Sequence, residues 1–283
     1  MIEIELLSAA SRALVYVGSV AVAGAMLFAA SFPRAGEAVA SELRWQARLG
    51  FLLLLIAEPL RYAVFQLAIA DGDWSLAFGP DMRWMGLQTP VGHAAAVRLI
   101  AAAVIVTIGL RLRALGLAAA LVMIGSFLLQ GHTVSGTPRL ALAAQLFVHL
   151  AAVHWWLGAL RPLSLLTRRG EPNLATAAVA SFSARAVWVV AALLAAGAAL
   201  ALALTGAEVR LDSPYQQRLL VKLVLVAAIL GIAARNKMRL LPLLESDYAV
   251  GAAKLRASIR WEIAAALAVL TASAWLVGVA PDA

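Results

Sequence analysis

The residues best suited to chemistry are four histidines and a pair of nearby methionines, in a chain without cysteine. Imidazole nitrogen suits copper and other transition metals, and the methionine thioether favours Cu(I). The absence of cysteine excludes disulfides and thiolate metal sites. These residue types therefore predict a metal site for a copper ion, with the candidate ligands His93, His132, His149, His154, Met82 and Met85.

The elements that carry these residues are long apolar runs. Of the 283 residues, 63% are hydrophobic and only 13% are charged, whereas a soluble domain carries roughly 25% charged residues. Runs of about 20 apolar residues match the length of a helix that crosses a bilayer. We predict an all-α, polytopic membrane protein that forms a single domain over residues 1–283. Its helices, about eight, are expected near residues 8–32, 45–70, 93–112, 114–130, 139–161, 181–206, 216–236 and 259–279.

Lysine and arginine are concentrated in alternate loops. This asymmetry marks the cytoplasmic side and predicts that both termini lie on the opposite, periplasmic side. The net charge of +8 is explained by this orientation, and no basic stretch is long enough to form a nucleic-acid-binding domain. We expect a lipid membrane, and no nucleic acid, as the surroundings of the chain.

The histidines lie at different depths. His93 opens the third predicted span and His132 closes the fourth, so both are expected at the outer surface. At 1.5 Å per residue, His149 is roughly 15 Å from Arg139, near the midplane, and His154 is deeper. The five-residue spacing separates these two side chains by roughly 140° around the helix. His149 is therefore expected to face a central cavity, while His154 is either a ligand elsewhere or a buried imidazole bonded to a backbone carbonyl.

Other charged residues fall inside the predicted spans, where each is a functional hypothesis by default. Glu58 and Arg61 are three residues apart and are expected to form an ion pair, with a proton relay through Glu58 as the alternative. Arg98 and Lys222 are expected to extend toward the outer surface. Glu262 is expected to form an ion pair with a cytoplasmic basic residue.

The fifth predicted span resembles a signature of the copper resistance protein D family, H-x(6)-W-x-G-x-L, at His149, Trp156, Gly158 and Leu160. Further positions resemble other motifs of that family in the same order along the chain. They are Thr89 to Gly92 with Arg98 and Leu99, Gly131 with His132, Ser213 to Tyr215, Leu220, Lys222, Leu223, Asn236, Pro242, Glu262 and Pro281.

This resemblance implies an eight-helix protein of the bacterial inner membrane that takes part in copper homeostasis. It implies movement of copper ions from periplasm toward cytoplasm, a periplasmic copper-binding protein as partner, and His132 and His149 as ligands. His93 and His154 match no motif of the family, so their assignment depends on their positions alone.

Two alternatives remain open, a membrane cytochrome that holds haem between axial histidines and a copper-delivery subunit without transport. The sequence contains no phosphate-binding loop and no H-E-x-x-H motif. We therefore expect neither an ATP-driven pump nor an enzyme.

Overall fold

The computed structural model describes residues 2–130, 139–206, 208–210 and 212–281, and every element that these residues form is helical. The long helices are α1 (Ile2–Ser31), α3 (Ala40–Ile69), α6 (Pro90–Val104), α8 (Arg139–Arg169), α9 (Pro172–Thr205), α10 (Pro214–Arg235) and α12 (Tyr248–Leu276). The shorter elements are α2 (Pro33–Ala38), α4 (Trp74–Ala77), α5 (Pro80–Leu87), η1 (Ile105–Gly109), α7 (Arg113–Gly125), η2 (Ser126–Leu129), η4 (Asn236–Leu240) and α11 (Leu241–Ser246).

Seven of the described helical segments are long and apolar enough to cross a membrane. An eighth apolar segment, Arg113–Leu129, is shorter and corresponds to the fourth predicted span. The prediction of an all-α polytopic membrane protein is thus confirmed at the level of seven long apolar helices.

Several helices extend further than the apolar runs predicted. Helix α9 begins at Pro172 rather than near residue 181, because a proline suits the first helical position. Helix α12 begins at Tyr248 rather than near residue 259, because the Asp247 side chain accepts a hydrogen bond from the amide of Val250. Hydropathy detects only the apolar part of such helices, whereas their ends are set by capping residues.

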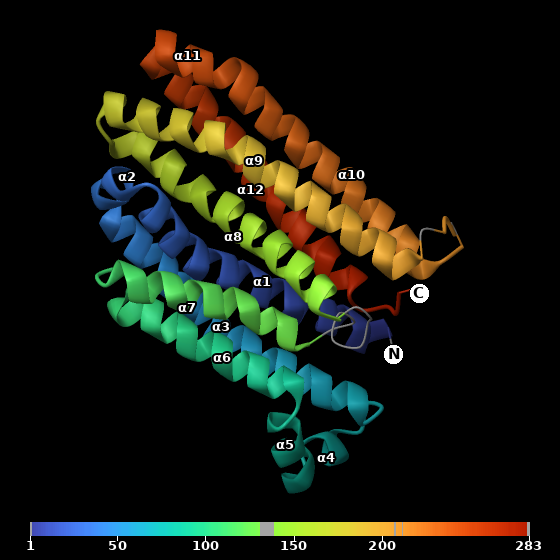
Figure 1. Cartoon of the computed structure of the whole chain (residues 1–283). Helices are drawn as coiled ribbons and strands as arrows, with labels where there is room; N and C mark the ends of the chain where they lie inside the picture. The colour runs from blue at the N-terminus through green and yellow to red at the C-terminus, as the bar shows by residue number, and fades with distance from the viewer. Residues whose placement is uncertain (1, 131–138, 207, 211, 282–283) are drawn as a thin grey trace.

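Helix α1 lies at the centre of the bundle, packed against α3, α7, α8 and α12 (Figure 1). The contact with α8 is close enough to require two glycines. A Cβ atom built on Gly24 would lie 2.4 Å from the Cα atom of Gly158. Small residues let membrane helices approach closely and gain van der Waals contact, so this pair fixes where α1 and α8 cross.

Both chain termini lie at the same end of the bundle (Figure 1). Arg218 of α10 forms an ion pair with Glu5 of α1, and Arg12 donates a hydrogen bond to the carbonyl of Ala274, 3.2 Å away. The membrane side on which this end lies stays a prediction, as does the single-domain organisation.

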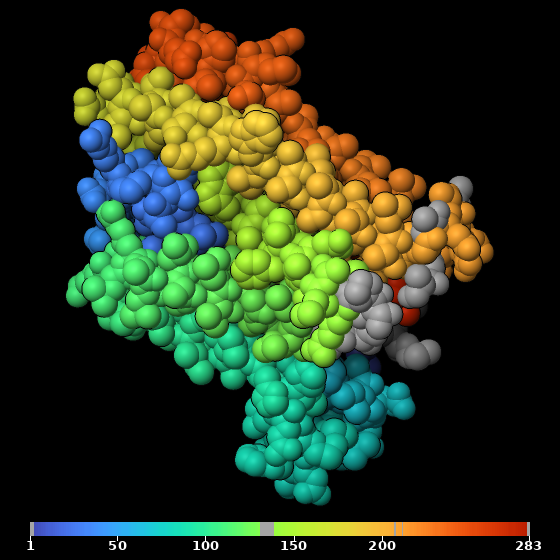
Figure 2. Space-filling view, in the orientation of Figure 1, coloured from blue at the N-terminus to red at the C-terminus, as the bar shows by residue number. Residues whose placement is uncertain are grey.

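Helices α4 and α5 project beyond the bundle, as Figures 1 and 2 show. The Asp73 side chain begins α4 by accepting hydrogen bonds from the hydroxyl of Ser75 and from the amides of Ser75 and Leu76. These bonds hold the pKa of Asp73 below its usual range. The cap therefore stays ionised at neutral pH.

Candidate functional site

His149 lies on α8 and faces α9. Its Nδ1 atom is 3.1 Å from the carbonyl oxygen of Leu193, and a carbonyl can only accept, so Nδ1 donates. The ring also lies against Gly197, where a Cβ atom would come within 3.1 Å of it. An imidazole that donates from one nitrogen to a carbonyl presents a lone pair on the other, as metal-binding histidines generally do. His149 can therefore offer Nε2 to a metal ion.

A second donor lies one helical turn before His149 on the same face of α8. The Oε1 atom of Gln145 is buried and has no hydrogen-bond partner in the part of the chain that the structure describes. A buried polar atom without a partner is rare in proteins, and such an atom commonly bonds to a water molecule or an ion. Lys222 of α10 is half-buried and interacts electrostatically with His149.

His154 faces a different neighbour. Its side chain is buried, with Nδ1 2.7 Å from the carbonyl oxygen of Leu150 and Nε2 2.9 Å from the hydroxyl of Ser19 on α1. Both ring nitrogens thus have partners, which matches the hydrogen-bonded buried imidazole that the sequence offered as an alternative. His149 and His154 face α9 and α1, respectively, so they do not form a pair of ligands for one metal ion or one haem.

Met82 and Met85 line the same hollow. Met82 and Met85, on the projecting helix α5, border a hollow of about 290 Å³ together with Asp81 and the start of α4. Met85 is exposed. His93 is exposed in the first turn of α6 and is not among the lining residues. His132, the remaining candidate ligand, lies outside the described residues.

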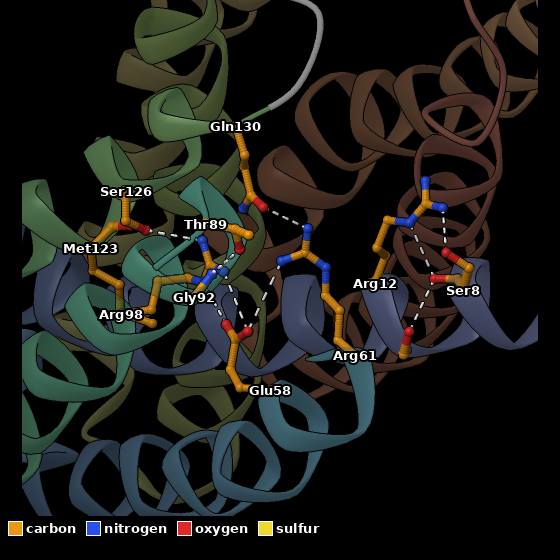
Figure 3. A network of polar contacts seen from close by, with 11 residues as sticks. Ser8, Arg12, Glu58, Arg61, Thr89, Gly92, Arg98, Met123, Ser126 and Gln130 are labelled. Atoms are coloured by element: carbon orange, nitrogen blue, oxygen red, sulfur yellow. Dashed lines mark hydrogen bonds and ion pairs between the residues drawn. The ribbon is translucent and has the colours of Figure 1, made fainter. Parts of the chain in front are cut away.

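A buried ionic network connects α3 with α6 (Figure 3). Arg98 donates from Nε to Glu58 over 2.5 Å, from Nη2 to the same carboxylate over 3.3 Å, and from Nη1 to Ser126 over 3.2 Å. Arg61 lies at the edge of this network, 4.0 Å from Glu58, and donates to Gln130 over 2.6 Å.

Two predictions about this network were wrong or incomplete. Arg98 does not extend outward, because it is fully buried beside a carboxylate on a neighbouring helix. Glu58 pairs mainly with Arg98 rather than with Arg61. Spacing along one helix reveals only partners within that helix, whereas the stronger partner comes from another one.

Glu262 of α12 has neutral partners. Its carboxylate accepts a hydrogen bond from Trp156 Nε1 over 3.1 Å and from Asn236 Nδ2 over 2.8 Å. The ion pair predicted for Glu262 is absent from the described residues. The residue that η4 places beside its carboxylate is Asn236, which is neutral.

No group of three or more histidine, aspartate or glutamate side chains that could hold a metal ion occurs among the described residues. The candidate metal donors are therefore spread along the chain as separate small groups. One is the methionine hollow on α5, and another is the His149 and Gln145 face of α8.

Seven long apolar helices in the described chain, with buried charges between them, define a class, that of polytopic membrane proteins. The chain belongs to the copper resistance protein D family. The family model for the copper resistance protein D-like N-terminal domain matches residues 1–139, and the model for copper resistance protein D matches residues 176–276. Comparison with curated proteins and with solved structures finds no match.

The two matched regions leave most of α8 between them. This helix carries His149, His154, Trp156 and Gly158, and it packs against α1 of the first region and against α9 and α12 of the second. The segment that joins the two matched regions therefore carries both His149 and His154.

Proposed function

We propose that the protein moves copper ions across the bacterial inner membrane, from the periplasm toward the cytoplasm, without acting as an enzyme. In this proposal both termini and the projecting helices α4 and α5 lie on the periplasmic side. Met82, Met85, His93 and His132 collect the ion there, and His149 receives it within the membrane. Membership of the copper resistance protein D family supports copper as the ion.

The observation that carries the proposal is the arrangement around His149. Its Nδ1 atom is engaged by Leu193, so Nε2 is available, and the unpartnered Oε1 atom of Gln145 lies one turn away. An imidazole and an amide oxygen give an incomplete coordination shell, and weak binding is what a passing ion requires. His154 has no part in this route, because both of its ring nitrogens are hydrogen-bonded.

The outer hollow supports the first step. Thioether sulfur is a soft donor that favours Cu(I), and Met82 and Met85 share one hollow beside Asp81. A periplasmic copper-binding protein is the partner that we propose to deliver the ion to this projecting part. The same helices expose the apolar side chains of Trp74, Leu76 and Trp84. These side chains either give such a partner a surface to contact or anchor the helices at the lipid interface.

Replacement of His149 tests the membrane step. We expect His149→Ala to abolish the copper accumulation that depends on this protein in cells, measured by mass spectrometry of cellular copper. Val148→Ala is the control, because Val148 is exposed on the same helix and carries no donor atom. Both variants are compared at equal expression. Unchanged copper accumulation in His149→Ala would overturn the route through this histidine.

Purified protein in proteoliposomes separates transport from delivery. We expect the protein alone to admit Cu(I) into vesicles, and His149→Ala to slow that entry at least tenfold. Wild-type protein that increases cellular copper but admits none into vesicles would overturn transport by this chain and favour a role in delivery.

A further inference from the structure

A cavity of about 280 Å³ lies in the second half of the bundle. Helix α9 packs along α8 and α10 packs along α12, and residues of all four helices line the cavity. Most of its lining is apolar, and the polar exceptions are Trp156, Ser183, Asn236, Lys237 and Glu262. Since a water molecule occupies about 30 Å³ in the liquid, the cavity has room for several.

Glu262 is the acid on this cavity, and its side chain is only 3% exposed. A buried carboxylate usually has a cationic partner, because an unpaired charge is costly away from water. Glu58 follows this rule through Arg98, whereas the two donors to Glu262 are a tryptophan and an asparagine. The carboxylate is thus held in place by groups that do not neutralise it.

The other groups that face Glu262 leave it unpaired. Lys237 of η4 lines the cavity, but its ammonium group lies 3.5 Å from the carbonyl oxygen of Ser183. From α8, Trp156 donates to the carboxylate, and Ser258 of its own helix donates to Asn236. The hydroxyl of Ser183, on α9, is buried without a hydrogen-bond partner in the described chain, which leaves it available to a water molecule in the cavity.

We propose that Glu262 takes up and releases a proton within this cavity and that the cavity is the proton site that accompanies copper movement. A hydronium ion in the cavity transfers its proton to one carboxylate oxygen, which yields a neutral carboxylic acid and a water molecule. Release is the reverse transfer to water. Trp156 and Asn236 keep the group in place in both forms. Only the coupling to copper rests on the proposed function.

A lipophilic carbodiimide tests the proton site without copper. Such reagents modify protonated carboxyl groups in apolar surroundings. In full-length protein in membranes, we expect peptide mapping to find Glu262 modified, less so as the pH rises from about 5 to about 9. Glu58 is the internal control, because both of its carboxylate oxygens are already bonded to Arg98. Modification of Glu262 that is independent of pH would overturn the proposal.

Two variants make the result decisive. Glu262→Gln should remove the modified peptide, and Trp156→Phe should carry the modification to higher pH, because the lost hydrogen bond favoured the charged form. If the reagent leaves Glu262 unmodified, infrared spectroscopy shows whether Glu262 binds a proton. A carboxylic acid band that appears at low pH and is lost in Glu262→Gln supports the proton site, and its absence overturns it.

The coupling between proton uptake at Glu262 and copper entry is tested in vesicles with a pH gradient. We expect Glu262→Gln to retain copper binding but to lose the dependence of copper entry on the gradient, while Glu245→Gln, at an exposed position, behaves as the wild type. Copper entry through Glu262→Gln that still follows the gradient would overturn the coupling. A modified Glu262 in a protein that admits no copper would leave the proton site standing and overturn only transport.

Discussion

Two buried carboxylates show how partners decide what a residue does. Glu58 and Glu262 are each nearly inaccessible on a membrane-spanning helix. Glu58 is bound through both oxygens to Arg98, whose guanidinium also lies over the ring of Phe127 at 4.6 Å. Glu262 accepts hydrogen bonds from neutral groups beside a cavity. The first arrangement locks two helices together, and the second leaves a group free to exchange a proton.

Loss of the ion pair between Glu58 and Arg98 should lower the stability of the protein. We expect Glu58→Gln to destabilise the protein by about 3–5 kcal/mol, because Arg98 would remain buried without its counter-charge. Thermal unfolding in detergent measures this effect, and the double variant Glu58→Gln with Arg98→Gln should lose less than the sum of the single losses. A Glu58→Gln protein as stable as Glu245→Gln would contradict the structural role of the pair.

At the residue scale, sequence predicts which side chains matter better than it predicts their partners. Angular spacing predicted that His149 and His154 face different neighbours, which the structure shows, because this spacing follows from helix geometry alone. Their depth in the membrane stays a prediction. The partners of Arg98 and Glu262 could not be predicted, because they lie on other helical segments, 26 or more positions away in the chain. The unpartnered oxygen of Gln145 had no signal in the sequence at all.

At the scale of elements, the projecting pair α4 and α5 brings two soft donors to one hollow. Met82 and Met85 are three residues apart on a helix, which places them side by side. We expect Met82→Leu with Met85→Leu to weaken Cu(I) binding by purified protein in lipid nanodiscs at least tenfold, because leucine keeps the apolar volume and removes both sulfur atoms.

The control for this pair is Met238→Leu. Met238 is also exposed, but it lies in η4 rather than on the projecting helices, so its loss should leave Cu(I) binding unchanged. Equal affinity in the wild type and the double variant would show that the hollow does not collect the ion.

Elements of this size were the hardest to predict. The long apolar runs indicate spans directly, but α4 begins with the cap of Asp73 and α5 with Pro80, both short-range signals without an apolar run. The π-helical segments η1 and η4 leave no hydropathy signature either. As a result, the sequence predicted the apolar framework, but it predicted no helix between residues 70 and 93, where α4 and α5 form the methionine hollow.

At the scale of the whole molecule, the crossing of α1 and α8 holds the two halves together. Gly24 and Gly158 approach so closely that neither has room for a side chain. We expect Gly158→Ala to destabilise the protein by about 1–3 kcal/mol, because the added methyl group forces the helices apart. Thermal unfolding and fluorescence-detected size-exclusion chromatography measure the loss of the folded protein.

Gly231→Ala is the matched control. Gly231 is also helical, on α10, but a Cβ atom there would meet no other atom within 4 Å. This substitution should preserve stability or increase it slightly, since alanine favours helix over glycine. If both substitutions had the same effect, the crossing would not be the critical contact.

The position of α8 between the two matched regions has a consequence for hybrid proteins. A chimaera that joins residues 1–138 of this chain to the remainder of a distant relative would import a foreign α8, whose surface evolved against another α1. Such a chimaera would fail to fold because its α1 and α8 do not fit each other, and not because of a defect within either half. A viable hybrid should therefore inherit α1 and α8 from the same parent, even though more than a hundred residues separate them.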